Sequence, residues 1–391
     1  MIPYGRQNIN EEDIEAVIEV LKSDFITQGP VVPEFEKAVA KYTSANYGVA
    51  VNSATSALHI ACLALGVGRG DVVWTSPISF VASSNCAIYC GAKVDFVDID
   101  KNTYNMSIDC LEMKLKDAKR NNTLPKVVIP VHLAGQSCEM EEIKKLSDKY
   151  GFKIIEDASH AIGGKYKDQP VGSCNFSDIT VFSFHPVKII TTGEGGIALT
   201  NDEKIANDMA KFRSHGIIRN KNEMTQKEKG LWHYEQVDLG FNYRMTDIYA
   251  ALGLSQLKRI DEFIKRRHEI ANIYDKRLKK INWLSLPFQA EHSYTSYHLY
   301  IIRIKNEISE INHRDFFEKL RNSGLLVNLH YIPIYRHPFY SNMGFNKKDF
   351  PESESYFSEA ISIPIFPSLR KEEQEEIVKI IKSPLGFQSL F

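Results

Sequence analysis

A lysine between apolar residues and a glycine-rich turn has the surroundings of a reactive amine. Lys188 follows the apolar run 179–184 and precedes the turn 193–196. An ammonium group is costly to bury without a partner, whereas a desolvated lysine has a lowered pKa and an amine that can form a Schiff base. The alternative is a surface lysine at the end of a strand, because charged side chains are rarely fully buried. On these residues alone, both interpretations stay open.

Small and hydroxyl-bearing residues occupy positions 52–57, between a predicted strand at 48–51 and a predicted helix at 57–65. Free backbone N–H groups at the start of a helix, with the hydroxyls of Ser53, Thr55 and Ser56 beside them, form a phosphate-binding site. Ordinary capping of the helix explains the same residues equally well.

Two further groups follow predicted strands. Phe80 comes after residues 76–79 and could stack on a flat ring, or it could be a buried core residue. Asp157, followed by His160, could accept a hydrogen bond from a protonated ring nitrogen, or it could form an Asx-turn or cap a helix. Each of these signals is weak by itself.

The pattern of elements places these groups together. Short apolar strands alternate with amphipathic helices up to about residue 200, which predicts an α/β fold with a mostly parallel sheet covered on both faces. Ligands of such sheets bind beyond the carboxyl ends of the strands. The expected helices are 11–22, 32–42, 57–65, 80–89 and 140–150, and the expected strands are 48–51, 72–75, 93–98, 127–132, 153–156, 179–184 and 196–199.

The pattern changes after about residue 245, which predicts a smaller C-terminal α+β domain. We expect a large α/β domain over 1–250 and a small domain over 251–391. A long helical run would link the two. The elements expected here are the helical run 246–278, strands 299–304 and 325–329, helix 314–321, and helix 371–381 with its cap at Ser368.

Composition excludes several classes of protein. The 391 residues carry 48 basic and 49 acidic side chains, so neither a nucleic-acid groove nor an anionic membrane patch is expected. No apolar window is long enough for a transmembrane helix, and the first residues do not form a signal peptide. The six cysteines form no C-x-x-C pair, which favours a reducing, cytoplasmic location.

The constellation is more specific than its parts. A phosphate cradle, an aromatic ring, a carboxylate and a lysine would meet at one edge of the sheet. These are the groups that pyridoxal 5′-phosphate (PLP) requires, because the lysine binds its aldehyde and the carboxylate keeps its pyridine nitrogen protonated. We therefore predict a PLP site with Lys188 and Asp157 as its catalytic residues, and no metal.

Longer segments around these residues resemble the nucleotide-sugar aminotransferase (DegT) family. The match includes EDASHAIG at 156–163, FSFHPVK at 182–188 and TTGEGG at 191–196. It follows the whole chain in order, with further segments at 27–29, 52–58, 76–80, 213–216, 240–245 and 362–364. The resemblance implies the aspartate aminotransferase fold, in which a large α/β/α domain carries PLP and a smaller α+β domain follows.

The resemblance also implies a role for each matching residue. Lys188 would hold the cofactor, Asp157 would pair with its pyridine nitrogen, Phe80 would stack on its ring, and His160 would lie near the ring substituents. The active unit would be a homodimer with its active site at the subunit interface. The phosphate would be bound by Thr55, Ser56, Ser183 and, from the neighbouring subunit, Asn242.

Within the family, the likeness is greatest to members that act in pseudaminic acid biosynthesis. They aminate C4 of UDP-2-acetamido-2,6-dideoxy-β-L-arabino-hex-4-ulose with L-glutamate as donor. One departure is Ile332, where a lysine is commoner in relatives. The implied substrate-binding residues are Tyr4, Asp24, Phe25, Ile26, Thr27, Ser53, Ser183, Asn242, His330, Tyr331, Ile332 and Pro333.

Three alternatives remain at this point. The chain could aminate another 4-keto nucleotide sugar, such as a GDP- or dTDP-linked one. It could be a PLP-dependent sugar dehydratase, although such members of the family carry histidine in place of the lysine. It could also bind PLP without catalysis. The presence of Lys188 and Asp157 favours transamination, with Lys188 as general base and acid in two half-reactions.

Overall fold

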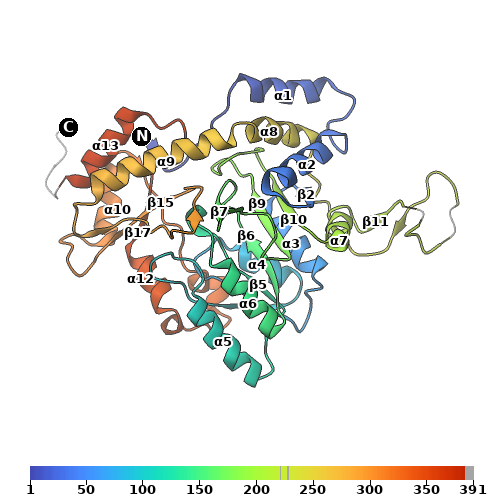
Figure 1. Cartoon of the computed structure of the whole chain (residues 1–391), viewed down its shortest axis with the longest axis horizontal. Coiled ribbons are helices and arrows are strands. Elements are labelled where there is room, and N and C mark those ends of the chain that lie inside the picture. The colour runs from blue at the N-terminus through green and yellow to red at the C-terminus, as the bar shows by residue number, and fades with distance from the viewer. Residues whose placement is uncertain (221, 227–228, 384–391) are drawn as a thin grey trace.

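A seven-stranded sheet forms the centre of the computed structural model, which describes residues 1–220, 222–226 and 229–383. Strand β10 runs antiparallel to both of its neighbours, β2 and β9, and the remaining pairs are parallel (Figure 1). The predicted α/β class with a mostly parallel sheet is therefore confirmed. In spatial order the strands are β2 (Tyr47–Val51), β10 (Gly196–Thr200), β9 (Ile179–Ser183), β6 (Lys153–Asp157), β5 (Val127–Ile129), β3 (Val72–Thr75) and β4 (Lys93–Phe96).

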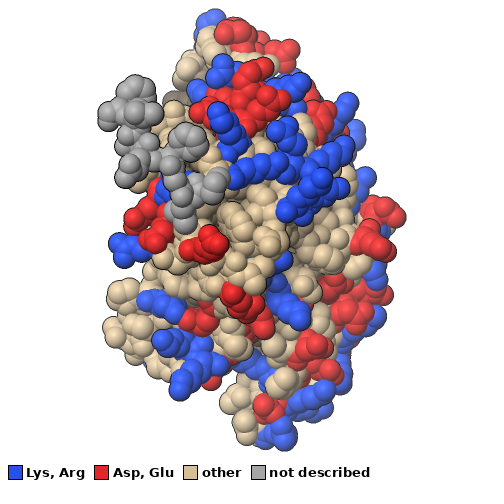
Figure 2. Space-filling model, turned by 90° about the vertical axis from the view of Figure 1, so that its left-hand side faces the viewer, with Lys and Arg blue, Asp and Glu red and all other residues tan. Residues whose placement is uncertain are grey.

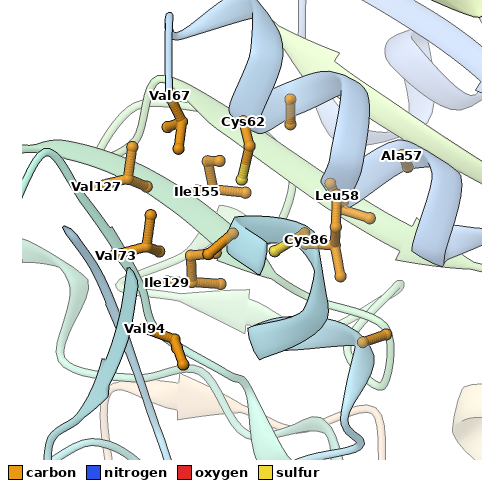
Figure 3. Packing of buried hydrophobic residues seen from close by; sticks show 14 of the residues in the cluster. Ala57, Leu58, Cys62, Val67, Val73, Cys86, Val94, Val127, Ile129 and Ile155 are labelled. Atoms are coloured by element: carbon orange, nitrogen blue, oxygen red, sulfur yellow. The ribbon is translucent and has the colours of Figure 1, made fainter. Parts of the chain in front are cut away.

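Helices cover both faces of this sheet because successive strand residues point to opposite sides. Val127 and Ile129 pack against α3 and α4, whereas Val128 between them packs against α5 and α6. Figure 3 shows the first of these layers, in which Cys62 and Cys86 meet Ile155 and the valines of the sheet. The helices are α1 (Glu11–Lys22), α2 (Val31–Thr43), α3 (Ala54–Ala64), α4 (Ala82–Tyr89), α5 (Ile108–Arg120), α6 (Met140–Tyr150) and α7 (Glu203–Arg213).

The long helical run expected at 246–278 is two helices, α8 (Asp247–Leu257) and α9 (Ile260–Leu278). Arg259 between them leaves helical geometry, and its guanidinium donates to Asn8 and to the carboxylate of Asp13. The break lets α8 pack beside α1 and α2 while α9 continues to the C-terminal part of the chain (Figure 1). Hydrophobic periodicity does not reveal such a break, because apolar residues continue on both sides of it.

The C-terminal part is built on a three-stranded sheet, β13-β15-β17. Of the strand expected at 325–329, Leu325–Leu326 forms β16, which lies parallel to β1 (Ile2–Pro3), and Asn328 makes an isolated bridge to Ser362. Helix α13 begins after Arg370 rather than at the expected cap, Ser368. The two-domain boundary near residue 250 stays a prediction. The elements here are β13 (Leu284–Ser285), β15 (Tyr300–Ile304), α10 (His313–Asn322), α11 (Pro338–Ser341), α12 (Pro351–Glu359), β17 (Ala360–Ile363) and α13 (Lys371–Lys382).

Short elements join these parts. A small sheet links β14 (Ser293–Tyr294) to β7 (Lys165–Tyr166) and β8 (Gln169–Pro170), and a hairpin of β11 (Ile217–Ile218) and β12 (Glu235–Gln236) projects from the body (Figure 1). Within the described residues, short 3₁₀ turns lie at Leu133–Gly135, Ile334–Arg336 and Lys347–Asp349.

The surface carries interspersed charge. Figure 2 shows side chains of both signs on one face, around a central area without charged side chains, and the net charge of the chain is near zero. Among the described residues, no helix combines the length and the apolar character needed to cross a membrane.

Candidate active site

The carboxyl ends of neighbouring strands meet at one edge of the central sheet, beside a cavity of about 890 Å³. Gly196 pairs with both Val51 and Ser183, and Asp157 pairs with Val181, so the ends of β2, β9 and β6 lie next to each other. This convergence brings together most of the predicted site. Of the predicted residues, the cavity is lined by Tyr4, Ser53, Thr55, Ser56, Phe80, Asp157, His160, Ser183, Lys188, His330 and Tyr331.

Lys188 lies in the loop that joins β9 to the antiparallel β10. The loop is closed by hydrogen bonds from Phe184 N–H to the Gly195 oxygen (2.9 Å) and from Thr192 N–H to the Phe184 oxygen (3.0 Å). A Cβ atom on Gly195 would lie 2.2 Å from Thr192 Oγ1, so this close return needs glycine. Burial lowers the pKa of Lys188 to about 8, against the opposing effect of the Asp157 charge. The amine therefore loses its proton more easily than that of an ordinary lysine.

Asp157 ends β6 with its carboxylate held from both sides. Ser83 Oγ donates to Oδ2 (2.6 Å), and the Ser159 hydroxyl (2.6 Å) and N–H (3.2 Å) donate to Oδ1. Ser79 Oγ lies 2.6 Å from Ser83 Oγ and continues this chain of hydroxyls. The Ser159 contacts are those of an Asx-turn, which the sequence offered as the alternative. Here the turn orients the carboxylate of a residue that lines the cavity.

Helix α3 begins at the same edge and offers free donors. Ser53 caps it by accepting from Ser56 N–H (3.1 Å), and Ser56 Oγ donates to Asn52 Oδ1 (2.6 Å). Within the described part of the chain, the N–H groups of Ala54 and Thr55 have no hydrogen-bond partner. Capping and a phosphate site thus coexist, since the cap uses the third N–H of the helix and leaves the first two for an anion.

Phe80 is exposed toward this cavity rather than buried in the core. Its side chain is 59% accessible and its ring centroid lies 6.4 Å from that of Tyr331. His160 is buried, and its Nε2 lies 3.1 Å from Tyr331 Oη. Both positions suit a flat ring held between Phe80 and the floor of the cavity.

The predicted substrate-binding residues do not all come together. Ile332 is 43% exposed and Pro333 is buried, and neither lines the cavity. Asn242 is exposed and lies outside the cavity of its own chain. The same holds for the stretch Asp24, Phe25, Ile26 and Thr27. The predicted binding roles of these residues stay predictions. In a dimer, such residues would contact the cavity of the second copy, and not the cavity of their own chain.

Several cavity residues escaped the sequence analysis. His298 lines the cavity with its ring centroid 4.3 Å from that of His160, and Asn328 lies near His330. Ser83 and Ser159 were not recognised as partners of Asp157. Ser159 follows Asp157 by two residues, so an Asx-turn pattern could have indicated it. His298 carries no local signal, since it reaches the cavity from the start of a strand in another part of the chain.

This arrangement fits PLP. The carboxylate of Asp157 is oriented by three donors and can accept from a pyridine nitrogen, and the α3 N–H groups can bind a phosphate. Gly196 shapes the cradle, since a Cβ there would lie 2.5 Å from Ala54 N. Lys188, with its lowered pKa, supplies the amine that such a cofactor needs.

Known proteins give independent information. Residues 7–382 match the model of the DegT/DnrJ/EryC1/StrS aminotransferase family. The chain is 38% identical over 364 residues to the UDP-4-amino-4,6-dideoxy-N-acetyl-beta-L-altrosamine transaminase of Campylobacter jejuni, covering 93% of this chain and 92% of that protein.

Two solved structures share the whole architecture. Helicobacter pylori PseC, an aminotransferase involved in the biosynthesis of pseudoaminic acid, superposes with a TM-score of 0.88 at 32% identity, covering 97% of this chain and 98% of PseC. Spr1654 of Streptococcus pneumoniae, solved in PMP-form and in PLP-form, superposes with a TM-score of 0.87 for the PMP-form at 30% identity, covering 98% of each chain. The chain therefore belongs to the DegT/DnrJ/EryC1/StrS aminotransferase family, and it is a PLP-dependent sugar aminotransferase.

Proposed function

We propose that this aminotransferase moves an amino group from L-glutamate to C4 of UDP-2-acetamido-2,6-dideoxy-β-L-arabino-hex-4-ulose, a step of pseudaminic acid biosynthesis. Support comes from the Campylobacter transaminase, which is named for the corresponding amino sugar, and from PseC. One structural observation carries the catalytic part of the proposal. A single cavity contains Lys188, Asp157 and the free end of α3.

Lys188 is the residue that moves protons in this proposal. Its lowered pKa, about 8, leaves a useful fraction of the amine neutral near physiological pH, so it can both accept and return a proton. General acid–base transfer of this kind contributes roughly 10²–10⁴-fold to a rate. PLP, when bound, supplies the electron sink for the carbon that gains or loses nitrogen.

The other residues of the cavity hold the reacting groups in place. Asp157 would accept a hydrogen bond from the ring nitrogen of the cofactor, and the bonds from Ser83 and Ser159 orient its carboxylate. Thr55, Ser56 and Ser183 would bind the phosphate, and Phe80 would cover one face of the ring. Tyr4, His330 and Tyr331, which line the rest of the cavity, contact the sugar nucleotide.

The active unit in this proposal is a homodimer, in which Asn242 completes the cavity of the partner copy. Asn242 follows the projecting hairpin of β11 and β12 (Figure 1). The segment around that hairpin exposes Leu231, Trp232 and Leu239. Large exposed apolar side chains on a projecting segment favour a protein partner, and in this proposal the partner is a second copy of the chain.

The second candidate is amination of another 4-keto nucleotide sugar, GDP- or dTDP-linked. Ile332 distinguishes this chain from relatives that carry a lysine here, but the diphosphate that such a lysine would attract is common to UDP-, GDP- and dTDP-linked sugars. Dehydration is disfavoured by Lys188, and binding without catalysis is disfavoured by the intact pair of Lys188 and Asp157.

A coupled assay separates these candidates. The purified enzyme, with PLP and L-glutamate, is offered UDP-, GDP- and dTDP-linked 4-keto sugars, and 2-oxoglutarate release is followed together with the mass of the sugar product. The proposal expects the highest kcat/KM for the UDP-linked hexulose. A preference of tenfold or more for a GDP- or dTDP-linked sugar would transfer the proposal to that substrate.

A further inference from the structure

His160 is held in the cavity by contacts to both of its ring nitrogens and to its backbone oxygen. Ala134 N–H donates to its Nδ1 (3.3 Å), Ser296 Oγ donates to its backbone oxygen (2.6 Å), and its Nε2 lies 3.1 Å from Tyr331 Oη. The ring also packs at 4.3 Å from that of His298. None of these supporting contacts belongs to the roles derived above.

The contact with Ala134 fixes the tautomer of His160. A backbone N–H can only donate, so Nδ1 must accept and carries no proton. The neutral ring then has its proton on Nε2, which makes Nε2 the donor to Tyr331 Oη. Tyr331 receives this bond through a lone pair, and its own hydroxyl proton is left to point to another acceptor. Tyr331 lines the cavity, where a substrate would lie.

Both side chains stay neutral, which preserves the direction of these bonds. Burial, together with the charges of Lys188 and His330, holds the pKa of His160 well below its ordinary value. Burial also raises the pKa of Tyr331, with smaller contributions from Tyr4 and Asp157. The pair therefore remains imidazole and phenol over the range in which the enzyme would work.

Two segments far apart in the chain clamp His160. Gly135, in the turn Leu133–Gly135 after β5, has a φ of 105°, and a Cβ there would lie 2.2 Å from Ser296 Oγ. Ser296 N–H donates to the Gly135 oxygen (3.1 Å), and Leu299 N–H donates to the Ala134 oxygen (3.3 Å). The turn and the segment 296–299 thus form one unit around the histidine.

We propose that Ser296 and the turn Leu133–Gly135 are positioning residues, which fix His160 as its Nε2–H tautomer so that Tyr331 presents its hydroxyl proton to a substrate oxygen. That oxygen is either a carboxylate oxygen of the amino donor or the carbonyl oxygen of the keto sugar. The inference rests on the proposed assignment of this cavity as the active site, but not on the identity of the sugar.

The tautomer is tested first, on the holoenzyme labelled with ¹⁵N-histidine, with the His160 resonances assigned by their absence in His160→Gln. The inference expects the proton on Nε2 and none on Nδ1. In Ser296→Ala, we expect the second tautomer to become visible. A proton on Nδ1 in the unaltered enzyme, or an unchanged His160 spectrum in Ser296→Ala, would overturn the inference.

The substrate oxygen is identified from single half-reactions, each followed by cofactor absorbance. Tyr331→Phe should slow at least one of them by roughly tenfold, the effect of losing one neutral hydrogen bond, and Ser296→Ala should slow the same one by about threefold. Slowing with L-glutamate assigns the contact to the carboxylate, and slowing with the UDP-linked keto sugar assigns it to the carbonyl. Unchanged half-reactions in Tyr331→Phe contradict the inference.

Ser353→Ala is the matched control, because Ser353 is also a fully buried serine whose hydroxyl donates one hydrogen bond, to Asp98, outside the cavity. Equal slowing in Ser353→Ala and Ser296→Ala would reduce Ser296 to a structural role and overturn the inference. Lys188→Ala distinguishes a failure of the active-site assignment from a failure of the inference about His160. If that variant still reacts, the active-site assignment fails. If it is inactive while His160 shows the wrong tautomer, only this inference fails.

Discussion

On the cofactor side of the cavity (Ser53, Ser56, Asp157 and Lys188), polar side chains are fixed mostly by neighbours in the sequence, as in the bonds from Ser159 to Asp157 and from Ser56 to Asn52. The C-terminal side (His298, His330 and Tyr331) is fixed across the chain instead. His330 Nδ1 contacts Ser362 Oγ (2.8 Å), and Tyr331 contacts His160.

This difference separates the part of the cavity that would hold the cofactor from the part that would select the substrate. The cofactor side stands on a single sheet, so a common chemistry can keep it rigid. The C-terminal side stands on loops that join two parts of the chain, and such loops can change without disturbing the sheet. Substitutions on the cofactor side should therefore cause the largest losses of activity, whereas those on the C-terminal side should have smaller effects that differ from one substrate to another.

The largest effect is expected for Lys188→Ala. Without the amine there is no group to bond to the aldehyde of the cofactor or to move the proton, so turnover should fall below detection and the imine absorbance at about 400 nm should vanish. Lys204→Ala, an exposed lysine on α7, serves as control and should behave as the unaltered enzyme. Residual turnover near the control level would contradict the role of the cofactor side.

Asp157→Asn should come next, with kcat lower by roughly 10²–10³-fold, because a neutral amide stabilises a protonated ring nitrogen poorly. Ser159→Ala removes only one donor to the same carboxylate and should cost roughly tenfold. Steady-state kinetics on both variants checks the order. If Ser159→Ala proved the more damaging, Asp157 would not be the electrostatic centre of the site.

The dimer is tested by mixing two inactive variants, Lys188→Ala and Asn242→Asp. If each cavity takes its lysine from one copy and its asparagine from the other, half of the sites in a mixed dimer are intact. Random mixing then restores about a quarter of the full activity. Mixtures that stay inactive, although mixed dimers form, would confine Asn242 to its own chain.

The lowered pKa of Lys188 predicts how the apoenzyme takes up PLP. The neutral amine is the reactive form, so the rate should rise about tenfold per pH unit below the pKa and level off above about 8. Stopped-flow absorbance at a series of pH values measures this rate of PLP uptake. A rate that keeps rising toward pH 10 would mean that the lysine has its ordinary pKa.

The smallest effect is expected for Ile332→Lys. Residue 332 is half-exposed outside the cavity, and an exposed charge contributes only about 0.2–1 kcal/mol. KM for the nucleotide sugar should therefore fall by less than about sixfold, with kcat unchanged. A larger change in KM, or any change in kcat, would place residue 332 in contact with the substrate and add it to the residues of the C-terminal side.

The sequence was a good guide to groups that depend on local order. Asp157, Lys188 and the start of α3 lie at or just after the ends of strands of one mostly parallel sheet, so the alternation of elements was enough to bring them to one edge. It could not reveal the end of the helix at Leu257 or the pairing of β1 with β16. His298 and Ser296 were missed because their roles arise only when 295–299 meets the turn after β5.

The most direct test of the central claim is chemical trapping. Holoenzyme is reduced with borohydride, which fixes the cofactor on the lysine that holds it, and peptides are then mapped by mass spectrometry. We predict that the pyridoxyl group is found on Lys188 and on no other lysine. A label on a different lysine, or an unlabelled Lys188 in an active preparation, would contradict the assignment of this cavity as the active site.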